Sequence, residues 1–201
     1  MEKEFGSLIG GLWKTSGEVL EVKSPYDAKT VGKVHLATPA LIEEALSSAT
    51  EAFKVLKKMP SWKRAEALLK TADGIDKRAA ELARTITLES GKPIRDSRGE
   101  VKRAALTFRL AAEEAGRLGG EVVPLDIAPG SDGRFAIVRR FPIGPVLGIT
   151  PFNFPLNLVA HKVAPAMASG NPIIIKPAPR TPLTALILGE IVTESLWPSG
   201  G

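Results

Sequence analysis

Two short apolar runs separated by a helical stretch constrain the fold more than any other feature of this sequence. Val146 to Thr150 (VLGIT) and Pro172 to Lys176 (PIIIK) are too short for buried helices and are typical of strands. Residues 155–169 carry apolar side chains at helical spacing, and Gly170 follows as a natural helix end. A strand, a helix and a strand within about thirty residues match a βαβ crossover, which favours a parallel sheet covered on both faces.

The region before this unit predicts strands followed by an amphipathic helix. Short β-prone runs at 18–22 and 30–34 lie between turn residues, which indicates a hairpin region. Thr38 and Pro39 form a helix start, because a threonine hydroxyl caps the first amides and proline needs no partner at the first helical position.

Three further helices are predicted from apolar stripes at helical spacing. One covers 61–91 without interruption, and the next covers 94–118 and ends at Gly119. Thr181 and Pro182 repeat the cap-and-proline signal and open the last helix, after which the chain stops without a further strand. We therefore expect the sequence to be a fragment of a longer α/β protein.

A β-branched run at 134–140 (RFAIVRR), bounded by Gly133 and Pro142, predicts one arm of an antiparallel hairpin. The predicted fold class is α/β, with N-terminal helices, an incomplete Rossmann-like parallel sheet and this hairpin. We expect three parts: an N-terminal hairpin with helices at 1–118, the antiparallel hairpin at 119–143, and a truncated βαβα unit at 144–201.

Composition excludes several classes of function. The chain has no cysteine, so it offers no disulfide, no thiolate metal site and no cysteine nucleophile. His35 and His161 are its only histidines, too few to suggest a metal centre. The formal charge of +5 comes from basic residues scattered among acidic ones, which disfavours nucleic-acid binding. Neither a secretory signal nor a membrane-length apolar run is visible, so we expect a cytoplasmic protein.

Two loops at the ends of the predicted strands are the candidate binding region, because ligands of doubly wound sheets sit at the carboxyl ends of strands. The loop at 150–155 carries Asn153, whose amide offers uncharged donors suited to a developing oxyanion. For an isolated Asn before a helix, the simpler alternative is that it caps the helix or satisfies a turn. Lys176 ends the second strand, where it could bind ribose hydroxyls or simply face solvent.

Residues 144–184 (GPVLGITPFNFPLNLVAHKVAPAMASGNPIIIKPAPRTPLT) closely resemble the aldehyde dehydrogenase superfamily over a long, nearly ungapped stretch. Pro25 to Lys33 resembles an early strand of that family, LESGKP at 88–93 resembles a helix end, and 134–145 resembles its oligomerisation hairpin. The resemblance covers essentially the whole chain as the N-terminal part of such an enzyme.

The resemblance implies roles for residues of both loops. Asn153 matches the side-chain donor of the oxyanion hole, and Lys176 matches the lysine at the adenosine ribose. The implied reaction is attack by a cysteine thiolate on an aldehyde, hydride transfer to NAD or NADP, and hydrolysis assisted by a glutamate, which yields a carboxylic acid. That cysteine and that glutamate are not in this sequence, so the 201-residue chain alone is expected to be inactive. The remaining cofactor-binding candidates are Ile149, Thr150, Pro151, Phe152, Ala178, Pro179 and Arg180.

One departure from the family bears on the cofactor. Many members have Glu three positions after the strand-end lysine, where it repels a 2′-phosphate, whereas this sequence has Pro179 followed by Arg180. We hypothesise that the complete enzyme accepts NADP; the alternative is that Pro179 only stiffens the loop.

Two other functions stay open from the sequence. A truncated, non-catalytic protein could pair with a full-length subunit through the hairpin, and an all-α binding module with a disordered tail is disfavoured by the apolar strands. For the enzyme we expect a small-molecule aldehyde as substrate, no nucleic-acid or membrane partner, and a homo-oligomer, either a dimer or a tetramer. Lactaldehyde, succinate semialdehyde and glyceraldehyde 3-phosphate all remain candidate substrates.

Overall fold

The structure, a computed structural model, describes residues 3–201 and confirms the predicted α/β class. In chain order its elements are β1 (Lys3–Phe5), β2 (Ser7–Ile9), β3 (Leu12–Lys14), β4 (Val19–Lys23), β5 (Thr30–His35), α1 (Pro39–Leu56), α2 (Ser61–Lys77), α3 (Ala79–Ser90), α4 (Ile94–Ala115), β6 (Glu121–Pro124), β7 (Phe135–Val138), β8 (Val146–Ile149), α5 (Asn157–Ser169), β9 (Ile173–Lys176) and α6 (Leu183–Thr193).

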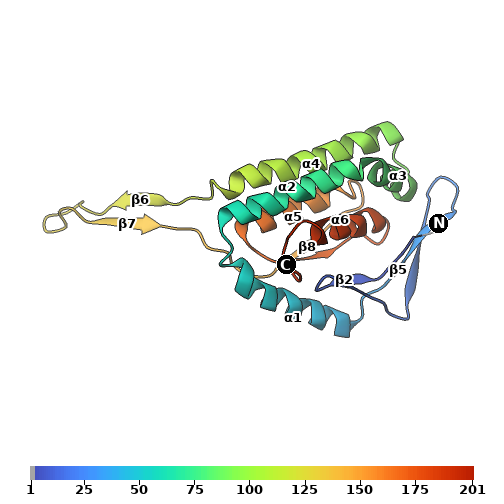
Figure 1. Ribbon diagram of the computed structural model, residues 1–201, viewed down its shortest axis with the longest axis horizontal. Helices are drawn as coiled ribbons and strands as arrows, with labels where there is room; N and C mark the ends of the chain where they lie inside the picture. Colours follow the sequence, from blue (N-terminus) through green and yellow to red (C-terminus); the bar gives the residue numbers. More distant parts are fainter. Residues whose placement is uncertain (1–2) are drawn as a thin grey trace.

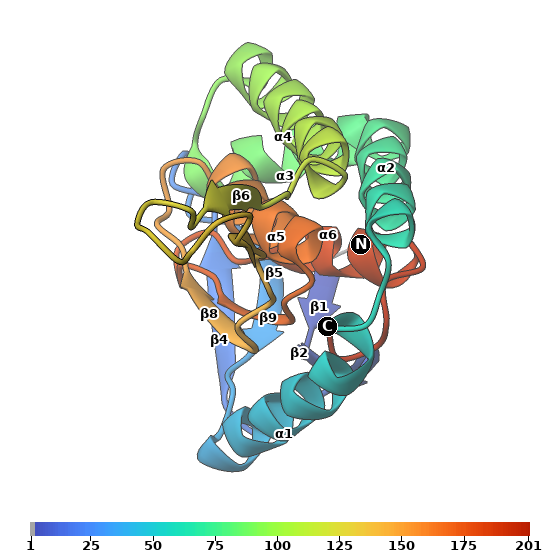
Figure 2. The same cartoon turned by 90° about the vertical axis from the view of Figure 1, so that its left-hand side faces the viewer.

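The helices lie mostly on one side of the strands (Figures 1 and 2). Helices α2, α3 and α4 form an outer layer, α5 and α6 lie between that layer and the strands, and α1 lies on the opposite side. The strands β8 and β9 pair in parallel across the α5 crossover, as the sequence predicts. A separate sheet has the order β1-β5-β4, with β4 and β5 antiparallel and β1 parallel to β5.

A single buried core joins the N-terminal helices to the βαβα unit. Phe108 of α4, Leu68 of α2 and Ile86 of α3 are fully buried in the same cluster as Leu156, which precedes α5, and Ile187 of α6. Burial of large side chains contributes on the order of 2 kcal/mol each to stability, so this shared core ties 1–118 firmly to 144–201.

Two helix predictions are confirmed at their ends. The Thr38 side chain accepts a hydrogen bond from the Leu41 amide at 3.3 Å, and Pro39 is the first residue of α1. Gly91 ends α3 with φ 75°, a left-handed conformation that glycine adopts without the steric cost a side chain brings.

Two other features of the predicted helices are wrong. The expected continuous helix over 61–91 is broken at Arg78, which leaves helical geometry at φ −100° and ψ 17°. Its guanidinium donates to Glu81 at 2.7 Å and to Glu190 of α6 at 2.8 Å, which fixes the break against a neighbouring helix. The helix predicted to continue to Leu118 ends at Ala115, because the chain turns there to enter the β6–β7 hairpin.

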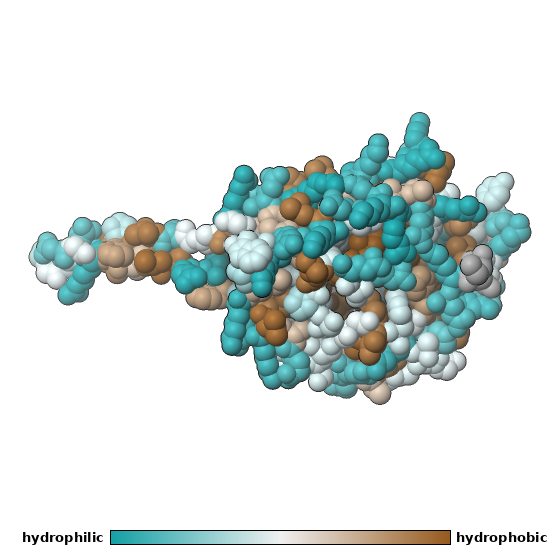
Figure 3. All heavy atoms as spheres, in the orientation of Figure 1, coloured by the Kyte–Doolittle hydropathy of each residue, from teal (hydrophilic) through white to brown (hydrophobic). Residues whose placement is uncertain are grey.

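The predicted antiparallel hairpin is confirmed: β6 pairs with β7, from Glu121 opposite Val138 to Pro124 opposite Phe135. It projects away from the body of the molecule (Figure 1), and hydrophobic residues lie along it among hydrophilic ones (Figure 3). Val122, Phe135 and Ile137 are each more than three-fifths exposed. Within residues 3–201, none of the helices combines the length and apolar character that a membrane crossing requires.

Candidate active-site edge

The two candidate loops leave the sheet at the same edge. In the parallel β8–β9 pair, Ile149 lies opposite Lys176, and the Thr150 amide donates to the Lys176 carbonyl at 3.2 Å. Because parallel strands end on the same side, the loop after β8 and the loop after β9 begin next to each other. The structure therefore brings together the two segments that the sequence singled out.

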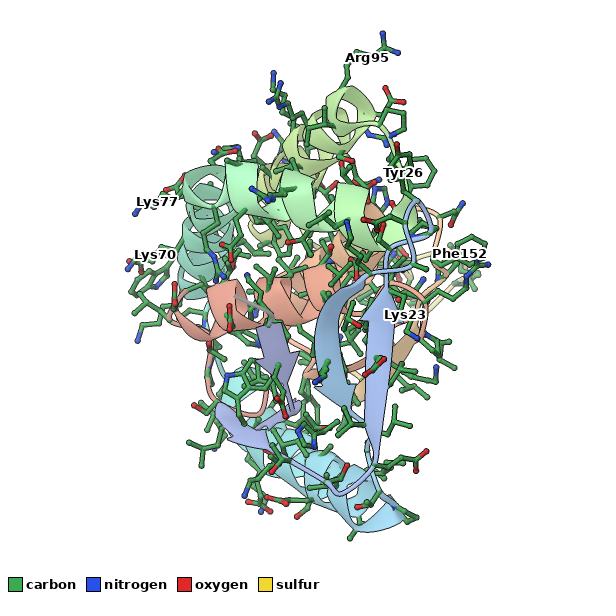
Figure 4. All side chains as sticks on the ribbon, turned by 90° about the vertical axis from the view of Figure 1, so that its right-hand side faces the viewer. Lys23, Tyr26, Lys70, Lys77, Arg95 and Phe152 are labelled. Atoms are coloured by element: carbon green, nitrogen blue, oxygen red, sulfur yellow. The ribbon has the colours of Figure 1, made fainter. Side chains whose placement is uncertain are left out.

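Side chains join these loops further out. The Thr181 hydroxyl donates to the Phe152 carbonyl at 3.4 Å, and the Arg180 guanidinium lies 4.6 Å from the centre of the Phe152 ring. Figure 4 shows Phe152 at the surface, pointing away from the body of the protein. A cation over an aromatic face is favourable by about 1 kcal/mol at an exposed position, so the pair helps to hold the loops together.

The candidate residues differ in their access to solvent. Asn153, Lys176, Pro151, Pro179 and Arg180 are exposed. By contrast, Thr150 and Ala178 are buried, so a ligand at this edge would reach them mainly through their backbone or after a local shift.

Two buried glutamates cap the helices that follow the strands. Glu100 of α4 accepts hydrogen bonds from the Leu156 and Asn157 amides at 2.9 and 3.1 Å, at the start of α5. Glu89 of α3 accepts from the Leu183 and Thr184 amides at 2.8 and 3.0 Å, at the start of α6. A carboxylate there satisfies amides that have no partner within the helix and meets the positive end of the helix dipole.

These caps correct one prediction and remove an alternative. Thr181 does not cap the last helix, because its hydroxyl bonds to the Phe152 carbonyl while Glu89 takes the first amides of α6. Asn153 is likewise not the cap of α5, since the Leu156 and Asn157 amides are occupied by Glu100.

Lys92 connects the Glu100 cap to the Asn153 loop. Its ammonium group forms an ion pair with the Glu100 carboxylate, donates to the Asn153 carbonyl at 3.0 Å, and lies 4.0 Å from the centre of the Phe154 ring. The side chain of Lys92 is 16% exposed and that of Glu100 is fully buried. The pairing gives the Glu100 charge a counter-ion, which a buried carboxylate requires.

Sequence reasoning missed Glu89, Lys92 and Glu100. A signal was present for Glu89, which lies three residues after Ile86 and seven after Leu82 on the buried face of α3. An acidic residue on an apolar helix face indicates an internal partner. The sequence offers no means of identifying that partner, which lies 94 residues further along the chain.

Burial raises the pKa of Glu89 to about 7, despite hydrogen bonds from Thr184 and Leu183 that favour the charged form. The Glu100 carboxylate adds a smaller effect in the same direction, because two negative charges in one buried region repel each other.

A family model described as "Aldehyde dehydrogenase family" matches residues 13–200. The chain belongs to the aldehyde dehydrogenase family. It is 43% identical to 3-sulfolactaldehyde dehydrogenase from Priestia aryabhattai over 198 residues, which make up 98% of this chain and 41% of that protein.

Solved structures of other proteins share the fold. Aldehyde dehydrogenase 21 from Physcomitrella patens, in complex with the reaction product succinate, has a TM-score of 0.95 and 44% identity, over 100% of this chain and 42% of that one. PnpE from Pseudomonas sp. WBC-3, also solved in complex with nicotinamide adenine dinucleotide, has a TM-score of 0.91 and 37% identity, over 100% of this chain and 40% of that one. The chain thus spans about two fifths of the length of these relatives.

The residues at this edge of the aldehyde dehydrogenase chain fit one part of a dinucleotide. An exposed ammonium at Lys176 suits ribose hydroxyls, and the exposed side chains of Ile149 and Phe152 suit a flat ring. The first amides of α5 and α6 are bonded to Glu100 and Glu89, so neither helix start is free to hold a phosphate as helix starts often do. The edge therefore fits the nucleoside portions rather than the pyrophosphate.

Glu89 makes the stability of this aldehyde dehydrogenase chain depend on pH. The pKa of Glu89 is about 7 in the folded protein and 4.5 is its ordinary value, so the folded state binds the proton more tightly than the unfolded state. The stabilisation that this proton provides is complete at low pH and is lost as the pH rises through about 7. Glu89→Gln removes the titration and keeps one side-chain oxygen, which can accept from only one of the Leu183 and Thr184 amides, because these donate to different oxygens of Glu89. In the wild type, deprotonation of Glu89 should lower the free energy of unfolding by about 2 kcal/mol between pH 5 and pH 8. We predict that this decrease is absent in E89Q.

The measurement is urea denaturation of the wild type and E89Q at matched pH values. Glu81→Gln is the control, since the pKa of Glu81 is lowered to about 2 by Arg78 and lies outside this range. Parallel pH profiles for wild type and E89Q would contradict the assignment of the titration to Glu89.

Proposed function

We propose that this chain supplies the oxyanion-binding amide and part of the cofactor site of an NAD(P)-dependent enzyme that oxidises an aldehyde to a carboxylic acid. The observation that carries the proposal is the exposure of Asn153 on the loop after β8, a loop that begins beside the end of β9. Family membership and the names of the relatives, all aldehyde dehydrogenases or solved with a dinucleotide, support it.

The residues of this chain have distinct tasks in the proposed reaction. The Asn153 side-chain amide donates a hydrogen bond to the oxygen that becomes negative when a nucleophile attacks the aldehyde carbon. Lys176 donates to a ribose hydroxyl, and Ile149 and Phe152 pack against the cofactor. The bound dinucleotide supplies the hydride acceptor. The chain has no cysteine, so the thiolate of the reaction comes from outside residues 1–201. The resemblance to the family assigns the water-activating glutamate to the same missing part.

A chimera tests this function. Residues 1–201 replace the matching part of the Priestia aryabhattai relative, whose remaining sequence completes the enzyme. We predict NAD(P)-linked aldehyde oxidation, followed at the absorbance of the reduced cofactor. Asn153→Ala should lower kcat about 100- to 1,000-fold, because one oxyanion donor is lost, with little change in cofactor binding.

Asn171→Ala is not a suitable control, since that amide bonds to the Ile143 and Gly144 backbone. Lys63→Met is suitable, because Lys63 lies over Trp62 at the surface. A chimera that folds cooperatively and oxidises no aldehyde with either cofactor would overturn the proposal.

For the cofactor, we propose that the enzyme accepts NADP. Pro179 and Arg180 bring no negative charge to the β9 loop, and the guanidinium of Arg180 is exposed where a 2′-phosphate could approach it. Loop rigidity is the competing explanation for Pro179.

Pro179→Glu in the chimera separates these explanations. A carboxylate beside Lys176 should lower kcat/KM for NADP about tenfold or more, because it repels the 2′-phosphate, while NAD turnover is kept. Pro179→Ala, which changes rigidity alone, should leave the ratio of NADP to NAD turnover unchanged. Strict use of NAD by the unmodified chimera would refute NADP acceptance.

A second proposed function is association through the β6–β7 hairpin, either with a second copy or with a full-length subunit. The specific observation that favours it is the projecting hairpin with exposed Val122, Phe135 and Ile137 (Figure 3). Apolar side chains concentrated on one projecting element are typical of protein–protein contacts.

Ile137→Asp should shift the 201-residue chain from a dimer or tetramer toward the monomer, because a charge would be buried in the contact. Size-exclusion chromatography with light scattering measures the mass, and Lys70→Asp on the exposed face of α2 is the control. An unchanged mass distribution in I137D would exclude the hairpin as the contact.

A further inference from the structure

Lys92 is held in place by the end of one helix and the start of the next. Gly91, with φ 75°, turns the chain at the end of α3, and Pro93 precedes the first residue of α4. A Cβ at Gly91 would lie 2.8 Å from the Pro25 side chain, so this turn depends on glycine for space as well as conformation. The side chain of Lys92 therefore leaves the backbone in a fixed direction.

The ammonium group of Lys92 has three groups around it. It pairs with the Glu100 carboxylate, donates to the Asn153 carbonyl at 3.0 Å and lies 4.0 Å from the centre of the Phe154 ring. Arg103 approaches the same ring at 5.0 Å. An ammonium has three N–H donors, and these contacts direct it toward the loop rather than toward solvent.

Lys92 and Glu100 together fix both ends of the segment 153–157. Glu100 holds the Leu156 and Asn157 amides at the start of α5, and Lys92 holds the carbonyl of Asn153. The Asn153 residue itself stays exposed. The backbone that carries the amide is thus restrained while the amide remains accessible.

We propose that Lys92 is a positioning residue, which holds the Asn153 carbonyl and thereby sets the direction of the Asn153 side-chain amide toward the aldehyde oxygen. The inference rests on the proposed function, since it assigns Lys92 a task in the reaction of Asn153. Its physical basis is that a misplacement of about 1 Å at a reacting group can cost about 100-fold in rate.

The experiment has to separate positioning from the cost of a buried charge. Lys92→Met alone leaves the Glu100 carboxylate without its counter-ion, which destabilises the fold for an unrelated reason. The double variant K92M/E100Q removes both charges and keeps an oxygen for the Leu156 and Asn157 amides. Lys92→Arg keeps the charge and the donors, and Lys63→Met is the matched surface control.

Hydrogen–deuterium exchange of the 201-residue chain is the first readout. In K92M/E100Q we expect exchange in peptides covering 150–157 to rise about tenfold, as expected for a loop that opens locally more often, with peptides from α2 unchanged. K92R, which keeps the charge and the donors, should exchange as slowly as the wild type, and K63M should do the same. Equal exchange at 150–157 in K92M/E100Q and K63M would overturn the proposal.

Kinetics of the chimera are the second readout. K92M/E100Q should lower kcat about 10- to 100-fold with the KM for the aldehyde unchanged, because the Asn153 amide acts on the transition state. K92R should retain most of the wild-type kcat. A kcat equal to that of K63M would refute the positioning role. If the unmodified chimera oxidises no aldehyde, the proposed function fails, and the exchange experiment still decides whether Lys92 restrains the Asn153 loop.

Discussion

The candidate site depends on the hydrogen bonds that the buried carboxylates of Glu89 and Glu100 accept from backbone amides. Each lies at the start of a helix that follows a strand, and each satisfies two backbone amides there. Glu89 comes from α3 and Glu100 from α4, so the outer helices determine where α5 and α6 begin. Without these carboxylates the amides would be buried unpaired, at a cost of about 1–3 kcal/mol each.

The same two carboxylates shape what the edge can bind. Because they occupy the helix starts, the exposed groups of the two loops include the Asn153 amide, the ammonium of Lys176, the guanidinium of Arg180, and apolar surface from Ile149 and Phe152. This combination suits a polarised carbonyl next to a nucleoside better than it suits a bare phosphate. The link from Glu100 through Lys92 to the Asn153 carbonyl extends the control of the outer helices to the candidate catalytic loop.

The sequence predicted those features whose signals are local. The β8–α5–β9 unit could be predicted because strands and helices differ in the spacing of apolar residues over a few positions. Thr38 and Gly91 could be predicted as helix ends because a threonine hydroxyl caps amides and glycine adopts a left-handed conformation. The break in the helix at Arg78 could not be predicted, because its cause includes an interaction with Glu190, which lies 112 residues away. The capping roles of Glu89 and Glu100 were hidden for the same reason, since their partner amides lie on distant segments. Long-range partners are fixed by the tertiary fold rather than by local pattern.

We propose that the edge formed by the β8 and β9 loops holds the nucleoside portion of the cofactor. Hydrogen–deuterium exchange of the chimera with and without saturating NADP tests it most directly. We expect slower exchange in the peptides covering 149–154 and 176–181, with the β6–β7 hairpin unaffected. NADP binding, measured by calorimetry, that leaves both of these segments unprotected would contradict it.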